Sequence, residues 1–310
     1  MKDKVSVIIP TMNRPSALKR TIKAYLKGTL IPTEIIIIDQ SNEEKFVEEI
    51  KIFLETIAKV KIVYYYQAIA SLTVARNKGF SLAENEIIIC SDDDVDVYEN
   101  TLENVVDIMR DKSVSMIGGL DDNMGLSRSG LGYLIGTKSF IKRKIGHVTL
   151  SMLGRYPNRV IDEVKTEWAM GYFFVIRKSL VEKWHISWDE NLTSYAYAED
   201  LDFSFNYYRK SNEEKLRCIL SDKVHVKHLG SLEYRVPSRR STFMYVINRY
   251  YLSVKHKMGL KSRIAMSWCN FWIYIFRVVK KNNPQDFKDA VKYKNKHKRE
   301  LKLGSIPYEL

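Results

Sequence analysis

Residues 86–96 read Glu-Ile-Ile-Ile-Cys-Ser-Asp-Asp-Asp-Val-Asp, an apolar run that ends directly in a cluster of acids. The three isoleucines and Cys90 are typical of a strand buried on both faces. In an open α/β sheet, ligands bind just beyond the carboxyl ends of the strands. The position of Asp92, Asp93 and Asp94 therefore predicts a binding site at the end of this strand.

The acidic cluster has two interpretations. Three adjacent carboxylates repel one another unless a cation or a polar ligand compensates their charge. Hard oxygen ligands suit Mg²⁺ or Mn²⁺, and such ions also bind substrate phosphates. A solvated acidic turn is the alternative for an isolated Asp-Asp-Asp. The buried strand before the cluster favours a metal–diphosphate site.

Outward from this strand, apolar runs alternate with segments of helical spacing. Strands are expected at residues 5–10, 34–39, 60–66, 86–90 and 114–119, and helices at 16–27, 43–58, 73–84 and 99–110. Such alternation is typical of a parallel sheet with crossover helices. The predicted fold class is therefore α/β, with a Rossmann-like, mostly parallel sheet flanked by helices.

The second half of the chain has a less regular pattern. Residues 120–165 show no clear period and are expected to form loops and short strands. Beyond them we expect a strand at 167–177, a helix at 179–184 capped by Ser179, a helix at 199–210 and a strand at 223–227. The surfaces that select a substrate are expected in residues 120–165 and around 195–197.

Residues 233–310 are basic and aromatic and are expected to form a helical appendage. The net charge of +13 comes mostly from residue 235 onward and suits nucleic acid, an anionic membrane face or a phosphate-bearing substrate. The apolar stretch 264–279 is shorter than the roughly 20 residues that a membrane span needs. It suits a helix in a membrane interface or one packed on the core, and the tail helices could also pair two chains.

The amino terminus and the cysteines bear on location. Residues 1–5 lack the apolar run of a signal peptide. The three cysteines are far apart, which fits a reducing compartment and argues against a disulfide framework or a cysteine-based zinc site. A cytoplasmic location is therefore expected, at the inner membrane face if the tail binds lipid.

Polar residues follow several of the predicted strands. Residues 11–14 and Asp39 follow the first two strands, where a nucleoside would lie. Asp39 could accept a hydrogen bond from a pyrimidine N–H, although an Asp at a strand end is often a turn residue. Arg76 and Asn77 place a guanidinium and an amide near the acidic cluster. Arg76 could contact phosphate or pair with an Asp.

Two further groups of residues could carry chemistry. Glu199, Asp200 and Asp202 open a predicted helix, where a carboxylate can act as a general base or simply complement the helix dipole. His225 and His228 lie on opposite faces of the last predicted strand. One of them could therefore face the site as a metal or phosphate ligand, although a His on a strand is ordinarily structural.

The order of these motifs resembles that of the family 2 glycosyltransferases, which have a GT-A fold. The resemblance runs from residue 5 to about 231, and more loosely to Asn248-Arg249. In the nucleotide half it matches the nucleotide loop at 7–14, the strand-end Asp39, the Ala-Arg-Asn-x-Gly motif at 75–79 and the Asp-x-Asp motif at Asp92 and Asp94. In the acceptor half it matches Gly171 with Arg177 and the Glu-Asp-x-Asp helix at 199–202. The late His of the family corresponds better to His228 than to His225. The chain differs from the pattern at Gln40 and at the additional Asp93.

The resemblance implies a domain organisation and an activity. Residues 1–232 would form the GT-A domain, with a nucleotide-sugar half at 1–119 and an acceptor half at 120–232, before the tail at 233–310. The activity would be the inverting transfer of a sugar from a UDP- or dTDP-sugar to a hydroxyl of a saccharide or lipid-linked saccharide. The product would belong to a surface polysaccharide or glycoconjugate.

The resemblance also assigns roles to residues. Asp94, with Asp92 and His228, would hold Mn²⁺ or Mg²⁺, and Asp200 would take the acceptor proton. The acceptor would contact Glu199, Gly171, Arg177 and Asp202. The nucleotide sugar would contact Pro10, Thr11, Asn13, Arg14, Asp39, Arg76, Asn77, Asp92 and Asp93.

Two other functions remain open from the sequence. A metal-dependent nucleotidyl- or phosphotransferase would use the same acidic cluster, but it leaves Glu199 and Asp200 without a role. A nucleic-acid-binding protein would use the basic tail. An acidic strand end in the core would repel a phosphate backbone, so no nucleic acid is expected as a partner.

Overall fold

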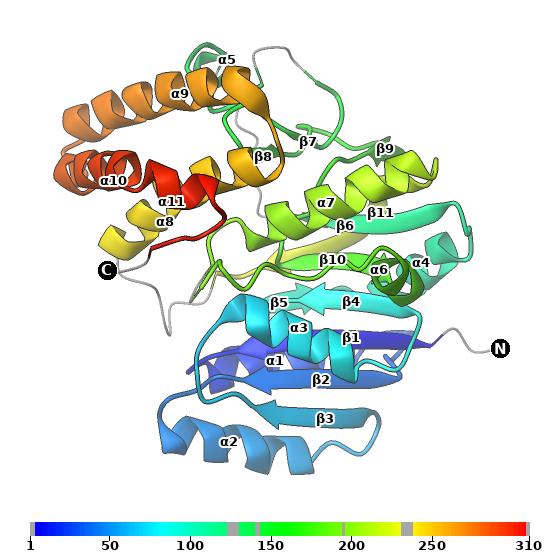
Figure 1. The fold of residues 1–310 in the computed structure, drawn as a ribbon. Helices are drawn as coiled ribbons and strands as arrows, with labels where there is room; N and C mark the ends of the chain where they lie inside the picture. Colours follow the sequence, from blue (N-terminus) through cyan, green and yellow to red (C-terminus); the bar gives the residue numbers. More distant parts are fainter. Residues whose placement is uncertain (1–3, 123–129, 140–142, 194–195, 231–237, 308–310) are drawn as a thin grey trace.

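The computed structural model describes residues 4–122, 130–139, 143–193, 196–230 and 238–307. Its centre is a nine-stranded sheet with the order β3-β2-β1-β4-β10-β6-β11-β5, to which β9 adds by pairing with β11 (Figure 1). The strands are β1 (Val5–Thr11), β2 (Glu34–Asp39), β3 (Lys61–Tyr66), β4 (Ile87–Ser91), β5 (Val95–Val97), β6 (Val114–Asp121), β9 (Glu163–Lys165), β10 (Phe173–Arg177) and β11 (Arg217–His228); β7 (His147–Val148) and β8 (Gly154–Arg155) form a separate pair.

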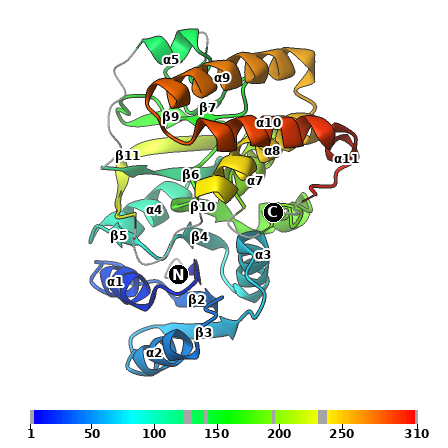
Figure 2. The ribbon, with the colours of Figure 1, turned by 90° about the vertical axis from the view of Figure 1, so that its left-hand side faces the viewer.

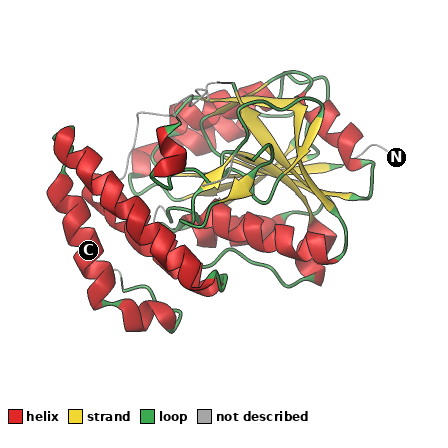
Figure 3. Cartoon of the chain, turned by 90° about the horizontal axis from the view of Figure 1, so that it is seen from above, coloured by secondary structure: helices red, strands yellow, loops and turns green. Residues whose placement is uncertain are grey.

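The helices follow the strands in the alternation that the sequence predicts. They are α1 (Pro15–Tyr25), α2 (Glu44–Glu55), α3 (Leu72–Leu82), α4 (Thr101–Met109), α5 (Leu131–Leu134), α6 (Lys178–Lys183), α7 (Glu199–Glu213), α8 (Ser238–Lys255), α9 (Gly259–Val279), α10 (Pro284–Lys296) and α11 (Lys298–Lys302). Helices cover both faces of the sheet, and the long C-terminal helices lie to one side of it (Figure 3). The predicted α/β class is confirmed.

Strands β1 to β4 pair in parallel, as expected for strands joined by crossover helices. Strand β10 runs antiparallel between β4 and β6 and thereby joins the two halves of the sheet. Strands β6 and β11 are again parallel to each other. The carboxyl ends of β1, β4 and β6 therefore meet at one edge, where the acidic cluster begins.

The isoleucine runs fill two cores because successive side chains in a strand point to opposite faces. Alternate residues such as Ile37 and Ile89 pack with α1, α2 and α4 on one face. The intervening residues, such as Ile38 and Ile88, pack with α3, α6 and α7 on the other. This double burial explains why the strands read as continuous apolar runs.

Several predicted boundaries need correction. The strand expected at 167–177 is only β10, so Gly171 precedes the strand rather than lying in it. Ser179 does not cap α6; its hydroxyl donates to Glu86, and Arg177 occupies the cap position. The last strand, β11, begins earlier than expected, at Arg217. Residues 123–129 and 140–142 of the irregular region, and Tyr195, lie outside the described residues.

The C-terminal helices pack on the acceptor half and share a core with it. Phe243 and Ile247 of α8 and Phe287 of α10 pack with Leu201 and Phe205 of α7. The predicted division at residue 232 stays a prediction. Within the described ranges, no helix is both long and apolar enough to cross a membrane.

Candidate active site

A cavity of about 780 Å³ lies at the carboxyl ends of the central strands. The nucleotide half contributes residues at or beyond the carboxyl ends of β1 to β4, namely Pro10, Thr11, Met12, Arg14, Gln40, Ser71, Arg76, Asp92 and Asp93. The acceptor half contributes Asp121, Met152 to Arg155, Trp168, Met170 to Tyr172, Ala196 to Leu201 and His228, and the tail contributes Arg240. The cavity thus collects most of the predicted motifs in one place.

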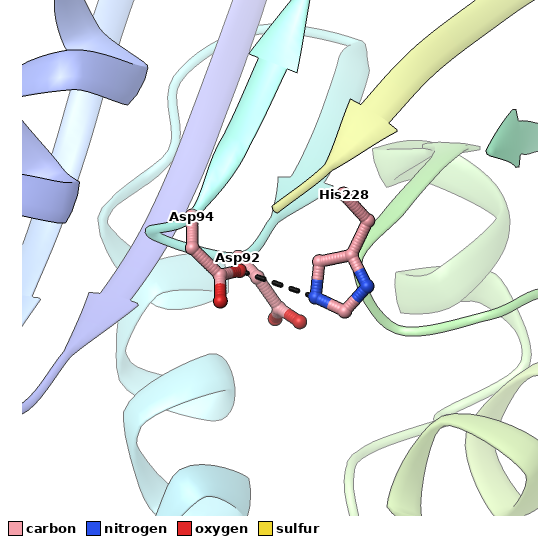
Figure 4. Close-up of side chains that lie close together, drawn as sticks. All are labelled: Asp92, Asp94 and His228. Carbon is pink, nitrogen blue, oxygen red and sulfur yellow. Dashed lines mark ion pairs between the residues drawn. The ribbon is translucent and has the colours of Figure 1, made fainter. Parts of the chain in front are cut away.

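Asp92, Asp94 and His228 form the metal-binding candidate within the described chain. One ligand atom of each residue lies within 4.8 Å of the others, and the three side chains converge from two elements (Figure 4). Strand β5 pairs antiparallel with β11, and this register places His228 opposite Val95, next to Asp94. Two carboxylates and an imidazole suit Mn²⁺ better than a soft ion. The residues present therefore fit the predicted cation.

His228 is held in place by its neighbours. Its Nε2 atom lies 3.2 Å from Asp94 Oδ1, and its ring stacks on Tyr172 with centroids 5.2 Å apart. Burial lowers the pKa of His228, but the hydrogen bond with Asp94 and the charges of Asp92 and Asp121 outweigh burial, so the net pKa is raised. A metal ion would replace that proton, because an imidazole must be neutral to ligate.

Asp93 bonds to Thr11 and Arg14 and is not part of the metal-binding candidate. Its Oδ2 atom accepts a hydrogen bond from Thr11 at 2.7 Å, and its Oδ1 atom accepts one from Arg14 at 3.1 Å. Burial raises the pKa of Asp93 to about 7, against the lowering effect of Arg14. The same guanidinium lies 3.6 Å from Asp94, so Arg14 contacts two of the three acids. Asp93 therefore positions Arg14 at the cavity wall.

Arg76 connects the two halves of the site. Its side chain is 1% exposed, and its Nη2 atom donates to Asp92 Oδ1 at 3.1 Å and to the Gly171 carbonyl at 3.0 Å. Its Nε atom lies 3.3 Å from Glu199 Oε1. Burial raises the pKa of Glu199 to about 8, although the charge of Arg76 acts to lower it. A buried cation thus lies between the metal-binding acid and the first residue of α7.

Asp200 is held by backbone groups at the start of α7. Its Oδ2 atom accepts from the Gly171 N–H at 2.9 Å, and its Oδ1 atom accepts from its neighbour Leu201 at 2.8 Å. Burial raises the pKa of Asp200, and these backbone hydrogen bonds oppose the shift. A Cβ atom on Gly171 would lie 3.1 Å from Asp200 Cβ and 3.2 Å from Arg76 Nη2. Only glycine leaves this contact undisturbed.

The predicted nucleoside residues divide into cavity residues and supporting residues. Pro10 and Thr11 line the cavity, whereas Asp39 is fully buried and accepts from Ser41 N–H and the Tyr64 hydroxyl. Asn13, at a positive φ of 55°, bonds to the loop after β2. Asp39 and Asn13 therefore shape the two loops that a base would contact.

Arg177 does not reach the site. It pairs with Ile87, at the opposite end of β4 from Asp92, and its side chain is buried. Its guanidinium donates to the backbone carbonyls of three residues, Met109, Asp111 and Val114. Arg177 is a structural residue, which corrects the prediction that it binds the acceptor.

Two further predicted residues lie outside the cavity and support the elements around it. Asp202 is 2% exposed and pairs with Lys255, the last residue of α8, at 2.6 Å and with His256, the next residue, at 2.8 Å. The Asn77 side chain bonds to the backbone N–H and C=O of Trp188. Neither residue lines the cavity, so neither is placed to contact the acceptor or the donor.

Sequence reasoning missed several cavity residues. Asp121 ends β6, and its carboxylate accepts from the His228 N–H at 3.1 Å; an acid just after a predicted strand was the available signal. Residues 152–155, Trp168 and Arg240 carry no such signal. They reach the cavity from β8 and the loop before it, from the loop before β10 and from the start of α8.

Comparison with known proteins identifies the family of this site. The family model described as "Glycosyl transferase family 2" matches residues 6–184, more than half of the chain. The chain belongs to glycosyl transferase family 2. The predicted resemblance is confirmed, and so is the GT-A fold.

Curated relatives match a shorter region. The chain is 31% identical over 104 residues to the uncharacterized glycosyltransferase YibD of Escherichia coli, a match that covers 34% of this chain and 30% of YibD. It is 30% identical over 129 residues to the poly(ribitol-phosphate) beta-N-acetylglucosaminyltransferase TarP of Staphylococcus aureus, covering 41% and 39%. The chain thus spans well under half the length of these relatives.

Solved structures show the same fold at low sequence identity. S. aureus TarS 1–349 matches with a TM-score of 0.53 and 17% identity, covering 90% of this chain and 73% of that one. The mannosyltransferase PcManGT from Pyrobaculum calidifontis, in complex with GDP-Man and Mn²⁺, matches with a TM-score of 0.55 and 13% identity, covering 97% and 83%. Nearly the whole chain, the C-terminal helices included, therefore falls within these alignments.

Proposed function

We propose that this protein is an inverting glycosyltransferase that moves a sugar from a UDP- or dTDP-sugar to an acceptor hydroxyl. One observation carries the proposal: Asp200, Asp92 and His228 line one cavity, and Asp94 completes the metal-binding candidate with the last two. Arg76 donates to Asp92 and to the Gly171 carbonyl, and the Gly171 N–H donates to Asp200. Sugar transfer from a nucleotide diphosphate needs a cation at the leaving group and a base at the attacking oxygen.

The nucleotide side would bind the donor. Asp92, Asp94 and His228 would hold Mn²⁺ or Mg²⁺, which supplies a positive charge that stabilises the departing diphosphate. Arg14 adds a guanidinium beside the same acids. Thr11 and Gln40 line the part of the cavity where the nucleoside would lie.

The acceptor side would activate the hydroxyl. Asp200 would take the proton of the attacking oxygen, because its carboxylate is fixed by two backbone N–H groups and its pKa is raised toward the working range. Glu199 would position the acceptor from beside it. Gly171 keeps both acids close to Arg76, which orients them without closing the cavity.

Relatives support a nucleotide-sugar donor and a polymeric acceptor. TarP is described by its name as acting on poly(ribitol-phosphate). Another neighbour by fold, GalNAc-T7, was solved with UDP, GalNAc and Mn²⁺. We propose a saccharide or lipid-linked saccharide as the acceptor, in surface polysaccharide or glycoconjugate synthesis. A nucleotidyltransferase reading is disfavoured because it gives Glu199 and Asp200 no role.

We place the reaction in the cytoplasm. Cys90, Cys218 and Cys269 are all free and buried, which fits a reducing compartment.

Two partners besides the substrates come into question, a second copy of the chain and nucleic acid. Sedimentation analysis would show whether the active form is a homo-oligomer. The acidic wall of the cavity gives no reason to expect nucleic acid as a partner.

The test is a calorimetric titration of UDP, dTDP and GDP, each with and without Mn²⁺. We expect one pyrimidine nucleotide to bind in the presence of Mn²⁺ and to bind at least about tenfold more weakly after chelation. Mass spectrometry of products from a panel of UDP- and dTDP-sugars would then identify the sugar. If none of the three nucleotides binds, the proposed donor site is wrong.

A further inference from the structure

Helix α9 exposes an apolar stripe along its whole length. Its members recur at helical spacing, at Leu260, Ile264, Trp268, Phe271, Ile275 and Val278. Leu260 is 67% exposed, Ile264 61% and Phe271 53%. Residues three and four apart lie on the same face of a helix, so these side chains form one continuous surface.

The opposite face of α9 packs in the core of the C-terminal helices. Ser262, Ala265, Met266, Cys269 and Asn270 are buried against the rest of the C-terminal helices. The sequence left two roles for this helix, a core helix or an interfacial one. The structure gives α9 a buried face and an exposed apolar face. Exposed apolar patches of this kind mark interaction surfaces, so we expect the exposed face of α9 to bind a partner.

Helix α5 extends the stripe. Leu131 and Leu134 of this helix are exposed, and the Trp268 indole N–H donates to the Leu134 carbonyl at 2.8 Å. Figures 1 and 2 show α5 and α9 side by side at the end of the molecule opposite β3 and α2. The two helices make a single region, called here the α5–α9 surface.

The charges around the stripe select its occupant. Helix α9 contains Lys261, Arg263 and Arg277 and no acidic residue, and Lys280 and Lys281 follow its end. Apolar and aromatic side chains flanked by basic ones fit the headgroup region of an anionic bilayer. A second copy of this chain would bring the same positive charges against each other, which disfavours pairing through this surface.

The α5–α9 surface is connected to the acceptor wall of the cavity. Arg155 lines the cavity, and its Nε atom donates to the carbonyl of Thr137, just beyond α5, at 2.7 Å. Arg249 of α8 donates to Asn270 of α9 at 3.0 Å and to the carbonyl of Ser151 at 2.8 Å. The elements that carry the apolar stripe therefore hold the part of the cavity that would face the acceptor.

We propose that the α5–α9 surface binds an anionic membrane and so brings the cavity to acceptors held in the lipid. The apolar stripe enters the headgroup layer while the basic residues contact lipid phosphates. The link to a lipid-held acceptor rests on the proposed function; the membrane contact itself does not.

Vesicle sedimentation tests the contact. The full chain is mixed with vesicles of phosphatidylcholine, with or without phosphatidylglycerol, at low and high salt. We expect binding to the anionic vesicles that weakens in salt, because exposed charges are screened. Ile264→Asn should weaken this binding roughly tenfold, and the double variant Ile264→Asn with Phe271→Asn should weaken it further, since each buried apolar group contributes.

Ile52→Asn is the matched control. Ile52 is 57% exposed on α2, at the other end of the molecule, so its replacement should leave vesicle binding unchanged. Equal vesicle binding by wild type and the double variant would overturn the proposal. So would no binding to any vesicle, or a wild-type dimer in sedimentation velocity that the double variant abolishes.

Nucleotide titration of the same preparations separates this proposal from the proposed function. A chain that binds UDP with Mn²⁺ but no vesicle refutes only the membrane surface. A chain that binds vesicles but no nucleotide refutes only the glycosyltransferase site.

Discussion

Arg76 Nε lies 3.3 Å from Glu199 Oε1, and both side chains are almost completely buried. The pair joins α3 of the nucleotide half to α7 of the acceptor half. Burial raises the pKa of Glu199 to about 8, so the Glu199 carboxyl is mostly protonated at neutral pH. The burial of Glu199 therefore makes folding stability depend on pH.

Glu199→Gln should gain stability relative to wild type as the pH rises from 5 to 8. In the unfolded chain Glu199 loses its proton near pH 4.5, and in the folded chain near 8. Between these values the folded state binds the extra proton, so wild-type stability falls as pH rises, whereas Gln does not titrate. Urea unfolding at several pH values measures the difference. A stability difference between Glu199→Gln and wild type that does not change with pH would contradict the prediction.

Gly171→Ala should lower turnover while leaving the protein folded. The added Cβ would come within 3.3 Å of Asp200, Arg76 and Glu199, so the groups around the cavity must move by a few tenths of an ångström. A shift of this kind near reacting atoms costs about tenfold or more in rate. Gly130→Ala is the control, because a Cβ there meets nothing within 4 Å. Equal turnover for the two variants would show that the contact is not functional.

Asp94→Asn should abolish the Mn²⁺ dependence of nucleotide binding. The change removes one carboxylate charge from the cluster of Asp92, Asp94 and His228. We expect Mn²⁺ affinity to fall by about a hundredfold, near the upper end of what altered metal sites show. The control is Asp96→Asn, which loses only an exposed ion pair with Arg20. Electron paramagnetic resonance of free Mn²⁺ compares the two, and similar affinities would remove Asp94 from the site.

Asp200→Asn and Asp202→Asn should separate catalysis from stability on one helix. Loss of a general base at Asp200 should lower turnover roughly 10²- to 10⁴-fold with nucleotide affinity unchanged. Asp202 instead pairs with Lys255 and His256, and breaking that buried group should cost about 3–5 kcal/mol of unfolding free energy. Turnover per folded molecule should stay near wild type for Asp202→Asn. If Asp202→Asn lost turnover and Asp200→Asn lost only stability, Asp202 and not Asp200 would be the catalytic residue.

The sequence predicted the nucleotide half well because its signals are local. Runs such as Ile35 to Ile38 are buried on both faces and leave little choice of structure. The acids that follow these strands then meet at one edge, because parallel strands place their carboxyl ends together. His228 and Asp200 were predicted from the order of motifs, and both line the cavity.

The acceptor half was predicted poorly because its geometry depends on long-range pairing. Gly171 and Arg177 are six positions apart, which in an extended chain is about 20 Å. Strand β10 runs antiparallel to β4, so Gly171 lies near Asp92 and Arg177 at the far end. Gly154 and Arg155 form a two-residue strand that no local pattern marks, and residues 152–153 lie in the loop before it. The exposed stripe of α9 was visible as apolar spacing, but only the packing of its other face shows which side is exposed.

Arg177→Met should destabilise the fold without changing turnover per folded molecule. Methionine cannot donate to the carbonyls of Met109, Asp111 and Val114, and an unsatisfied buried acceptor, as at Met109 and Val114, costs about 1–3 kcal/mol. We expect the unfolding free energy to fall by roughly 3 kcal/mol in urea titrations. Arg110→Met, which removes an exposed arginine nearby, should change it by less than about 0.5 kcal/mol. If Arg177→Met keeps normal stability but loses turnover or acceptor affinity, Arg177 belongs to the active site. Its structural role at the far end of β10 would then be wrong.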